Sequence, residues 1–476
     1  MARMRISGNE TVGRGHAVVI GASMSGLLAA RVLSETYRRV TIVDRDALPG
    51  RPTPRRGVPQ SYHAHGLLYR GREILDELFP GLSDEAVAHG AMLGDIQADF
   101  RWCSSGHTMR QADSGLRSLL ISRSLLEHVV RTRVAAQGDI RILEGCSVVG
   151  LASTDDCERV TGVRLRQTHT SAGTIDIDDS LAGDLVGDSL AADLVLDASG
   201  RASRSPQWLK ELGYRRPQRD EMHIGVAYAS RSYRREPDHL EGDSGIVIAA
   251  TPGNPRAGVM LAQEGGRWIV TLAGYLGDGP PIDSDGYAAF AATLPSQDIH
   301  AVIRTAEPLD DPRPTRYPSS IRHRYEHLRR MPERFVVFGD AICTFNPIYG
   351  QGMTVAAAEA LVLRDCLRRG TQQLGRRFAR RAAKVIDIPW DIVVGGDLRF
   401  PGVEGRRSLK VRVINGYLER VHLAAASDPA VGRAFLAVAN LTSRPERLLV
   451  PDVAARVIRG TWQRTTGART AALTRR

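Results

Sequence analysis

The sequence predicts an α/β fold: a Rossmann-like dinucleotide-binding domain with an inserted β-sheet domain and a helical C-terminal region. Three observations predict it. Residues 16–44 pass from strand to turn to helix to strand, residues 215–330 are rich in short strands separated by turns, and the chain after Pro389 is mostly helical in its periodicity. A chain of 476 residues is also too long for one ordinary small domain.

The first βαβ unit follows directly from the residue pattern. The stretch "HAVVI" predicts a buried strand, "GASMSG" a turn, "GLLAARVLSETY" a helix, and "RRVTIVD" a second strand ending at Asp44. Residues 45–66 are rich in Pro, Gly and Arg and keep no helix or strand period. They predict a long ordered loop after the second strand.

Later elements extend this pattern. "REILDELF" predicts a helix, and "SRSLLEHVVRTRVAAQG" predicts another that Ser122 or Ser124 caps. "RFVVFGDA" predicts a further strand, followed by a helix from about Met353 to Arg368. The expected boundaries are 14–75, 110–214 and 331–388 for a discontinuous dinucleotide-binding domain, 76–109 and 215–330 for a β-rich substrate domain, and 389–476 for the helical region.

The positive charge of the chain does not indicate a nucleic-acid partner. The net charge is +11, and three of the 64 basic residues are lysines, which leaves 61 arginines spread over the whole sequence. No zinc-finger, basic-zipper or RNA-binding motif accompanies them. We therefore expect no binding to nucleic acid.

The composition predicts a cytoplasmic protein without a transmembrane segment. Apolar residues make up 42% of the chain, yet no apolar run approaches the length of a membrane helix, about 18 residues. The N-terminus is basic but has no apolar core typical of a secretory signal. The five cysteines lack zinc-site or redox spacing, and their odd number disfavours a disulfide framework.

The turn "GASMSG" nearly matches the glycine fingerprint of a dinucleotide site. Gly21 makes the tight turn and Gly26 permits close packing of helix on strand, but Ser23 replaces the glycine that lets backbone approach the pyrophosphate. The serine hydroxyl lies near the positive end of the helix. Asp44 ends the next strand, where an acidic side chain binds ribose hydroxyls.

Two further motifs follow predicted strands. "ADLVLDASGRASRSP" delivers Asp197 and then a glycine turn at Gly200, and "FVVFGDAICTFNPIYGQGM" delivers Asp340. Open α/β sheets bind ligands at the carboxyl ends of their strands. The helix that starts after Gly350 and Gly352 offers unpaired N–H groups suited to an anion, including the charge on a reduced flavin ring.

Together the three motifs resemble the glycine fingerprint, "DG" and "GD" motifs of FAD-dependent monooxygenases of the aromatic-hydroxylase type, which have a single FAD-binding domain. The resemblance covers about residues 16–370, and the GD segment is its most specific part. More narrowly, "GVPQSYHAHGLL" together with the GD segment resembles the flavin epoxidases of polyether-antibiotic pathways. The resemblance implies antibiotic or other specialised biosynthesis.

The resemblance implies a set of FAD-binding residues. Two departures from the family pattern are Ser23 in the fingerprint and Ser199 within "DASG". The implied contacts are Gly21, Ser23 and Gly26 with the pyrophosphate, Asp44 and Arg45 with the adenosine ribose, Asp340 with the ribitol chain, Pro347, Gly350, Gly352 and Met353 with the flavin ring, Arg123 from a helix start, Arg56 and Gln60 from the loop, and Asp197 and Gly200 from the DG motif.

The implied chemistry requires FAD, NAD(P)H as reductant and O2 as co-substrate. One oxygen atom passes through a flavin C4a-hydroperoxide to a hydrophobic small molecule, by epoxidation or hydroxylation. The protein binds the cofactor, orients the substrate and excludes water. His63, His65 and Tyr349 are the candidate catalytic side chains near the flavin, and no residue spacing predicts a metal site.

Several alternatives remain open from the residues. A flavin-dependent halogenase shares the fold but needs a lysine near the flavin, and residues 45–120 contain none. A flavin-dependent reductase or dehydrogenase, a hydroxylase of an aromatic ring or nitrogen, an enzyme inserting oxygen beside a ketone, and a noncatalytic nucleotide-binding protein are the others. The sequence leaves the substrate, the choice between NADH and NADPH, and the oligomeric state undetermined.

Overall fold

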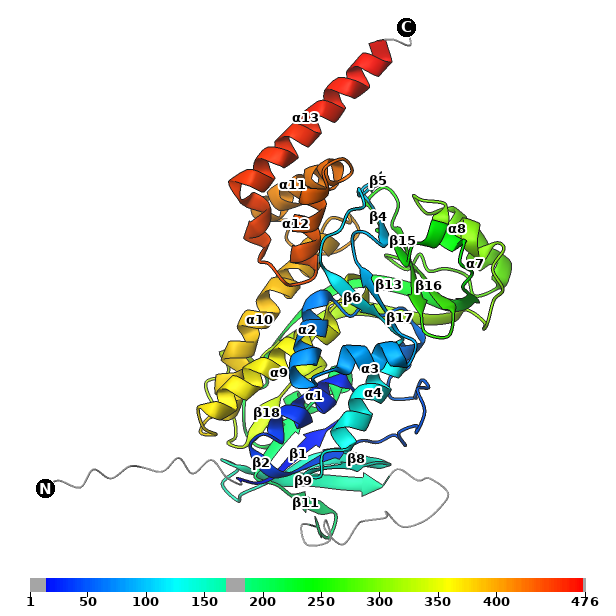
Figure 1. Cartoon of the computed structure of the whole chain (residues 1–476). Coiled ribbons are helices and arrows are strands. Elements are labelled where there is room, and N and C mark those ends of the chain that lie inside the picture. The colour runs from blue at the N-terminus through cyan, green and yellow to red at the C-terminus, as the bar shows by residue number, and fades with distance from the viewer. Residues whose placement is uncertain (1–13, 168–184, 474–476) are drawn as a thin grey trace, which may run out of the picture.

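The computed structural model describes residues 14–167 and 185–473, so the basic N-terminus used for the expected cellular location lies outside it. The described chain forms a parallel sheet with helices, a large and mostly antiparallel sheet beside it, and a C-terminal group of helices (Figure 1). The predicted α/β class, with a helical C-terminal region, is confirmed.

The parallel sheet has the strand order β18-β12-β1-β2-β7. Its strands are short apolar runs, as expected for a sheet covered on both faces. Because all five run in the same direction, their carboxyl ends meet at one edge. The strands are β1 Arg14–Ile20, β2 Tyr37–Val43, β7 Ile140–Leu143, β12 Leu194–Asp197 and β18 Phe335–Val337.

Helices of the same region pack on this sheet and on one another. The α1 helix contacts α9 and α4, α2 also contacts α9, and α3 contacts α4. Leu27, Leu28 and Leu33 of α1 are fully buried in the shared core. The helices are α1 Met24–Leu33, α2 Tyr69–Leu78, α3 Leu82–Ala88, α4 Arg123–Ala135, α6 Ser205–Glu211 and α9 Gly352–Arg368.

Two small sheets complete the architecture: β8 and β9 of one contact strands of the parallel sheet, and the other lies against α2, α3 and β15. One has the antiparallel order β10-β11-β9-β8, and the other pairs β3 with β6. The strands are β3 Met92–Asp95, β6 Arg117–Leu120, β8 Cys146–Ser153, β9 Val160–Gln167, β10 Leu185–Val186 and β11 Ser189–Ala191.

Ser122 caps the N-terminus of α4. Of the two predicted caps, its hydroxyl is the one that accepts a hydrogen bond, from the backbone N–H of Leu125 at 3.1 Å.

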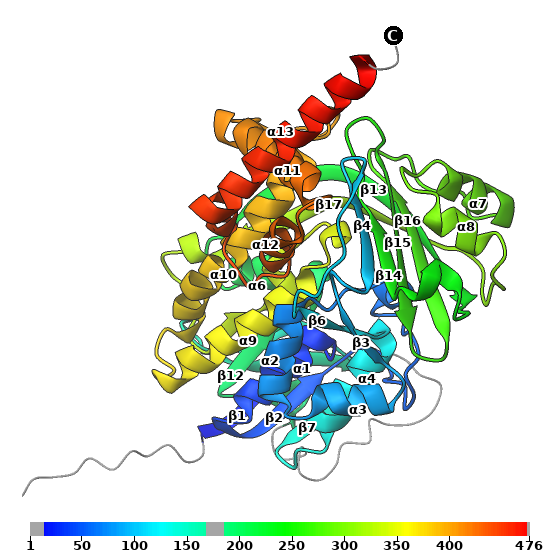
Figure 2. The same cartoon turned by 45° about the horizontal axis from the view of Figure 1, so that its top comes forward.

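The large sheet (Figure 2) has the order β19-β17-β13-β16-β15-β14-β4-β5. Trp268 and Tyr287 lie in a hydrophobic core of its own. Two helices pack in that core, although the sequence predicted mainly strands over 215–330. The elements are β4 Phe100–Ser104, β5 His107–Thr108, β13 Gln218–Arg234, β14 Gly245–Ile248, β15 Arg256–Gln263, β16 Arg267–Gly274, β17 Arg313–Arg324, β19 Cys343–Thr344, α7 Ser284–Ala292 and α8 Asp298–Ile303.

The C-terminal helices are α10 Leu374–Asp397, α11 Leu409–Ala425, α12 Pro429–Ala439 and α13 Pro451–Leu473. The α10 helix contacts α9 and β18 and continues through Pro389, so the expected start of the helical region at 389 falls inside one helix. A proline removes one N–H donor but need not end a long packed helix. Among the described helices, none combines the length and apolarity needed to cross a membrane.

Short 3-10 turns connect several elements, and η2, η5 and η6 hold residues of the candidate site. The turns are η1 Pro59–Tyr62, η2 Gly200–Ala202, η3 His239–Gly242, η4 Tyr325–His327, η5 Gly339–Ala341, η6 Pro347–Tyr349 and η7 Pro445–Leu449.

Candidate functional site

The three predicted motifs come together at the carboxyl edge of the parallel sheet. Gly21 follows β1, Asp197 ends β12, and Gly339 lies just beyond β18, on three adjacent strands. A Cβ atom built at Gly200 would lie 4.0 Å from Cβ of Asp340. The DG and GD turns therefore face one another beside the glycine turn, as the position of ligand sites in open α/β sheets requires.

Two of the fingerprint glycines are required by geometry. Gly21 has φ of +102°, and a Cβ there would lie 2.8 Å from the carbonyl oxygen of Ala198 in the neighbouring motif. A Cβ at Gly26 would collide with the carbonyl oxygen of Gly21. These contacts give Gly21 and Gly26 the turn and packing roles that the sequence predicted.

The Ser23 hydroxyl takes part in a buried polar network. It accepts a hydrogen bond from Nη2 of Arg123 at 2.8 Å and donates one to Oε2 of Glu127 at 3.1 Å. Ser23 is the N-cap residue of α1, yet its side chain caps no backbone N–H of that helix. The serine thus connects the glycine turn to α4 through a contact that glycine cannot make.

Glu127 joins Ser23 to the loop that follows β2. Its Oε1 accepts from Nε of Arg55 at 3.0 Å, and its Oε2 also accepts from Arg123 at 3.1 Å. Burial acts to raise the pKa of Glu127, but the charges of Arg123 and Arg55, with hydrogen bonds from Arg55 and Ser23, lower it overall. Glu127 is therefore an ionised carboxylate inside the protein.

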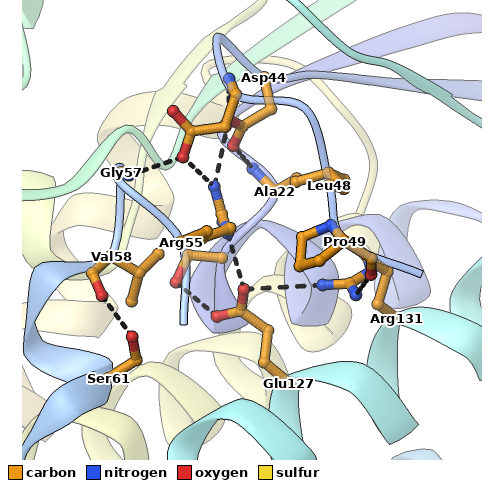
Figure 3. A network of polar contacts seen from close by, with 12 residues as sticks. Ala22, Asp44, Leu48, Pro49, Arg55, Gly57, Val58, Ser61, Glu127 and Arg131 are labelled. Carbon is orange, nitrogen blue, oxygen red and sulfur yellow. Dashed lines mark hydrogen bonds and ion pairs between the residues drawn. The ribbon is translucent and has the colours of Figure 1, made fainter. Parts of the chain in front are cut away.

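Asp44 occupies the other end of this network (Figure 3). Its Oδ2 accepts from the backbone N–H of Ala22 at 2.6 Å, and its Oδ1 lies 3.3 Å from Nη1 of Arg55. The same Nη1 donates to Asp46 at 2.9 Å. Arg55 therefore bridges Asp44 and Glu127, and the glycine turn is fixed directly to the acid that ends β2.

Asp197 holds the shape of its own turn. The carboxylate is fully buried and accepts from the backbone N–H of Ser199 at 2.9 Å and from the hydroxyls of Ser203 and Ser205. Gly200 has φ of +80° at the tip. In this "DASG" variant the serines occupy the carboxylate, and Gly200 is the residue that faces Asp340.

The GD segment leads into the start of α9. The backbone N–H of Gly339 donates to Oε2 of Glu359 at 2.8 Å, and burial raises the pKa of Glu359 to about 8. Burial also raises the pKa of Asp340. A Cβ at Gly352 would lie 3.9 Å from Oδ1 of Asp340, which places that carboxylate at the helix N-terminus.

Two buried polar atoms at the start of α9 have no hydrogen-bond partner among the described residues. They are Oε1 of Gln351 and Oγ1 of Thr354, on side chains that are 2% and 0% exposed. The first N–H groups of α9 also have no side-chain cap. Unsatisfied donors and acceptors therefore gather at the end of residues 346–350, the loop expected to border the flavin ring and called the flavin-side loop below.

The ring of His63 is held by side chains of the large sheet. Its Nδ1 lies 2.8 Å from Oγ of Ser230 and its Nε2 lies 2.6 Å from Oγ1 of Thr315, while its ring packs edge-on against Tyr228. Burial lowers the pKa of His63 to about 4. Both ring nitrogens are engaged with the large sheet, so His63 anchors the 45–66 loop and has no nitrogen left for a substrate.

His65 lies closer to the predicted flavin-side loop. Its Nδ1 lies 2.9 Å from the carbonyl oxygen of His63, and burial, followed by the charge of Arg123, lowers its pKa to about 4. A Cβ at Gly350 would lie 4.0 Å from the carbonyl oxygen of Gly66, so the two loops approach each other. His65 is thus a neutral imidazole next to the site.

Tyr349 directs its hydroxyl toward α10. The Oη atom donates to Oδ1 of Asp397 at 3.1 Å, and burial raises the pKa of Tyr349 well above its ordinary value. The tyrosine is therefore a neutral hydrogen-bond donor whose proton is directed at another side chain of the protein.

The remaining candidates differ in exposure. Arg45 and Arg56 are exposed, as is Pro347, while Gln60 and Met353 are half-buried. Three residues of these networks were not predicted from the sequence: Arg55, Glu127 and Asp397. Glu127 could have been found, because it follows Arg123 by four residues and shares its helix face.

Within the described residues, no cluster of His, Cys, Asp and Glu could hold a metal ion.

Solved structures with the same fold are flavin-dependent enzymes. They include the flavin-dependent halogenase CmlS (TM-score 0.62, 17% identity, 90% of this chain and 76% of that chain) and a flavoprotein/dehydrogenase from Cytophaga hutchinsonii (0.62, 16%, 93% and 96%). Another is pqsL, a probable FAD-dependent monooxygenase from Pseudomonas aeruginosa (0.57, 16%, 81% and 99%). At these identities the likeness establishes the fold alone, which is Rossmann-like.

Sequence comparison identifies a much more similar protein. No family model matches the chain. Protein Rv3254 of Mycobacterium tuberculosis (strain ATCC 25618 / H37Rv) is 35% identical over 396 residues, which are 81% of this chain and 80% of that protein. The chain therefore belongs to the same family as Protein Rv3254.

Proposed function

We propose that this protein is an FAD-dependent monooxygenase that uses NAD(P)H and O2 to add one oxygen atom to a hydrophobic small molecule, by epoxidation or hydroxylation. One observation carries the proposal: the glycine turn, the DG turn and the GD segment meet at one edge of the parallel sheet. The fold shared with flavin-dependent enzymes supports it.

The residues present fit FAD. Gly21 and Gly26 keep side chains out of the turn, and Arg123 places a cation beside Ser23, near the helix N-terminus where a pyrophosphate binds. At the other end, the unpartnered Oε1 of Gln351 and the uncapped N–H groups of α9 suit the polar edge of a flavin ring. Both ends of the cofactor thus have matching groups.

FAD, when bound, supplies the redox and oxygen chemistry, and the chain's own residues position it. Asp44 receives the adenosine ribose, which competes with Ala22 and Arg55 for its two oxygens. Asp340 receives the ribitol hydroxyls, and Gly350 and Gly352 keep the ring side of the site open. Because Nδ1 of His65 donates to the carbonyl oxygen of His63, the neutral imidazole offers Nε2 as a hydrogen-bond acceptor near the ring.

We propose that the large sheet holds an apolar substrate and excludes water from the reacting atoms. Ile224, Val226 and Tyr228 of β13 and Tyr275, which follows β16, form an apolar cluster that packs with Leu398 and Phe400 after α10. We place the substrate between this sheet and the flavin, with residues 215–330 as the main part of the substrate domain. The polyether-pathway epoxidases remain the narrower resemblance for the reaction type.

Halogenation is the less favoured alternative. A flavin-dependent halogenase of this fold needs a lysine near the flavin. The three lysines of this chain, Lys210, Lys384 and Lys410, are all exposed on α6, α10 and α11.

A reductase or dehydrogenase of similar fold differs from a monooxygenase in having no need for O2. The cytoplasm, which supplies NAD(P)H, is the proposed location.

The test is turnover of NAD(P)H by the FAD-loaded protein with a panel of hydrophobic alkenes and aromatic compounds under isotopically labelled O2. The proposal expects a product that carries one labelled oxygen atom. Equal product formation without O2 would favour the reductase, and a halogenated product formed with added bromide or chloride would favour the halogenase.

A further inference from the structure

Asp397 is a buried carboxylate at the end of α10 that contacts two other parts of the chain. It is fully buried, and its Oδ1 accepts from Nδ2 of Asn346 at 2.9 Å, from Oη of Tyr349 at 3.1 Å and from Oη of Tyr275 at 3.4 Å. Its Oδ2 is buried with no partner in the described part of the chain. Three donors therefore converge on one oxygen while the other is left unsatisfied.

Asn346 transmits this contact to the backbone of the predicted flavin-side loop. Its side chain is fully buried, and its Oδ1 accepts from the backbone N–H of Ile348 at 3.2 Å while its Nδ2 donates to Asp397. This bond caps the turn that leads to Gly350, whose φ is +65°. The Asn346 amide thus supports the shape of the loop, and its Nδ2 is held by Asp397 together with Oη of Tyr275, which accepts from it at 3.2 Å.

The groups that face Asp397 do not neutralise its charge. Tyr275, beyond the end of β16, stacks on Phe400 at 4.1 Å, and burial raises the pKa values of both Tyr275 and Tyr349. Arg399 is the charged side chain near Tyr349 on the segment after α10. Burial raises the pKa of Asp397 to about 7, although hydrogen bonds from Asn346, Tyr349 and Tyr275 oppose the rise.

Protonation of Asp397 must change the hydrogen bonds around it. The ionised form leaves a charged Oδ2 buried without a donor. A proton on Oδ2 would be a donor without an acceptor there. A proton on Oδ1 must be donated to the hydroxyl oxygen of Tyr349 or Tyr275, which reverses one of the present bonds. The two protonation states therefore hold the loop differently.

We propose that Asp397 is a positioning residue for the Asn346–Gly350 loop, and that gain or loss of its proton switches this loop between two hydrogen-bonded arrangements. The inference rests on the proposed function in one respect, that the loop borders the flavin ring. Through the loop, the switch couples α10 and the large sheet to the affinity for FAD.

The first arm of the test measures stability without cofactor. Thermal unfolding midpoints are compared between pH 5 and pH 8.5 for the full chain, for Asp397→Asn and for Asp391→Asn, a control on the exposed side of the same helix. Because the folded pKa of Asp397 is raised from 3.8, its contribution is complete below about pH 4 and is lost as the pH rises through about 7.

The Asp397→Asn variant should therefore gain stability over the wild type as the pH rises, with the unfolding equilibrium constants diverging by up to roughly tenfold per pH unit below the folded pKa. Asp391→Asn should run parallel to the wild type. Parallel profiles for the wild type and Asp397→Asn would overturn the proposal. If Asp397→Asn does not fold, Tyr349→Phe removes one donor and should move the transition to higher pH.

The second arm measures the FAD dissociation constant by fluorescence over the same pH range. The wild type and Asp391→Asn should show a step near pH 7 that Asp397→Asn lacks. If the wild type binds FAD but its dissociation constant shows no such step, the loop switch is overturned. If no variant binds FAD at any pH while the stability difference persists, the proposed function fails and the positioning role of Asp397 stands.

Discussion

Nη2 of Arg123 lies 2.8 Å from Oγ of Ser23, so the residue that departs from the glycine fingerprint is hydrogen-bonded to the residue expected to contact FAD. The same hydroxyl donates to Glu127. Ser23→Gly should keep FAD binding within a few-fold, because glycine suits the turn, but should lower the free energy of unfolding by about 1 kcal/mol through the lost hydrogen bonds. Calorimetry and FAD titration measure the two effects. Loss of FAD binding would make the hydroxyl a cofactor ligand.

Glu127→Gln should destabilise the cofactor-free protein strongly. The substitution leaves the guanidinium groups of Arg55 and Arg123 without their shared buried carboxylate, and breaking a buried ion pair costs about 3–5 kcal/mol. Saturating FAD should restore more stability to this variant than to the wild type, because the pyrophosphate supplies negative charge near Arg123. Unfolding midpoints with and without FAD measure this. Equal FAD-induced shifts in the unfolding midpoints of the variant and the wild type would contradict an interaction of the pyrophosphate with Arg123.

Arg55 and Arg56 are a matched pair of neighbours. Arg55→Ala should cost about 3–5 kcal/mol, since its side chain is 7% exposed and bridges Asp44 and Glu127. Arg56→Ala should change stability by no more than about 0.5 kcal/mol, because Arg56 is exposed. Denaturant unfolding of both variants measures the difference. Similar losses for the two would contradict the network as described.

His63 should make the protein sensitive to acid. Its folded pKa is lowered to about 4 from 6.5, so the unfolded chain binds more protons between these values. The stability contributed by neutral His63 is complete above about pH 6.5 and is lost as the pH falls through 4, a difference of about 3 kcal/mol. His63→Gln should flatten the stability profile over this window. An unchanged slope would show that His63 is protonated in the fold.

The sequence predicted the parallel-sheet region well because its information is local. The alternation from "HAVVI" to Asp44 specifies a βαβ unit, and motifs at the ends of parallel strands must share one edge of the sheet. The hydrogen-bond partners of His63 could not be predicted in this way, because Ser230 and Thr315 lie 167 and 252 residues away. No local pattern indicates such contacts.

The importance of Arg55 and of Asp397 could not be predicted from the sequence, for two different reasons. Arg55 and Arg56 are identical residues in an irregular loop, and without a period nothing in the sequence tells which one is buried. Asp397 ends a helix that continues past Pro389, and its importance depends on Asn346, Tyr349 and Tyr275 meeting around it. Such a cluster exists only in the folded chain.

The measurement that tests the central proposal most directly is an FAD titration of the purified full chain followed by its visible absorption spectrum. The wild type should acquire a protein-bound flavin spectrum with saturable binding. Gly21→Val should abolish this binding, because a side chain at φ of +102° meets the Ala198 carbonyl. Gly138→Val is the control and should bind FAD normally, because a Cβ atom built at Gly138 has no neighbouring atom within 4 Å. A wild-type protein that gains no flavin spectrum, or a Gly21→Val variant that binds FAD as well as the wild type, would contradict the proposed site.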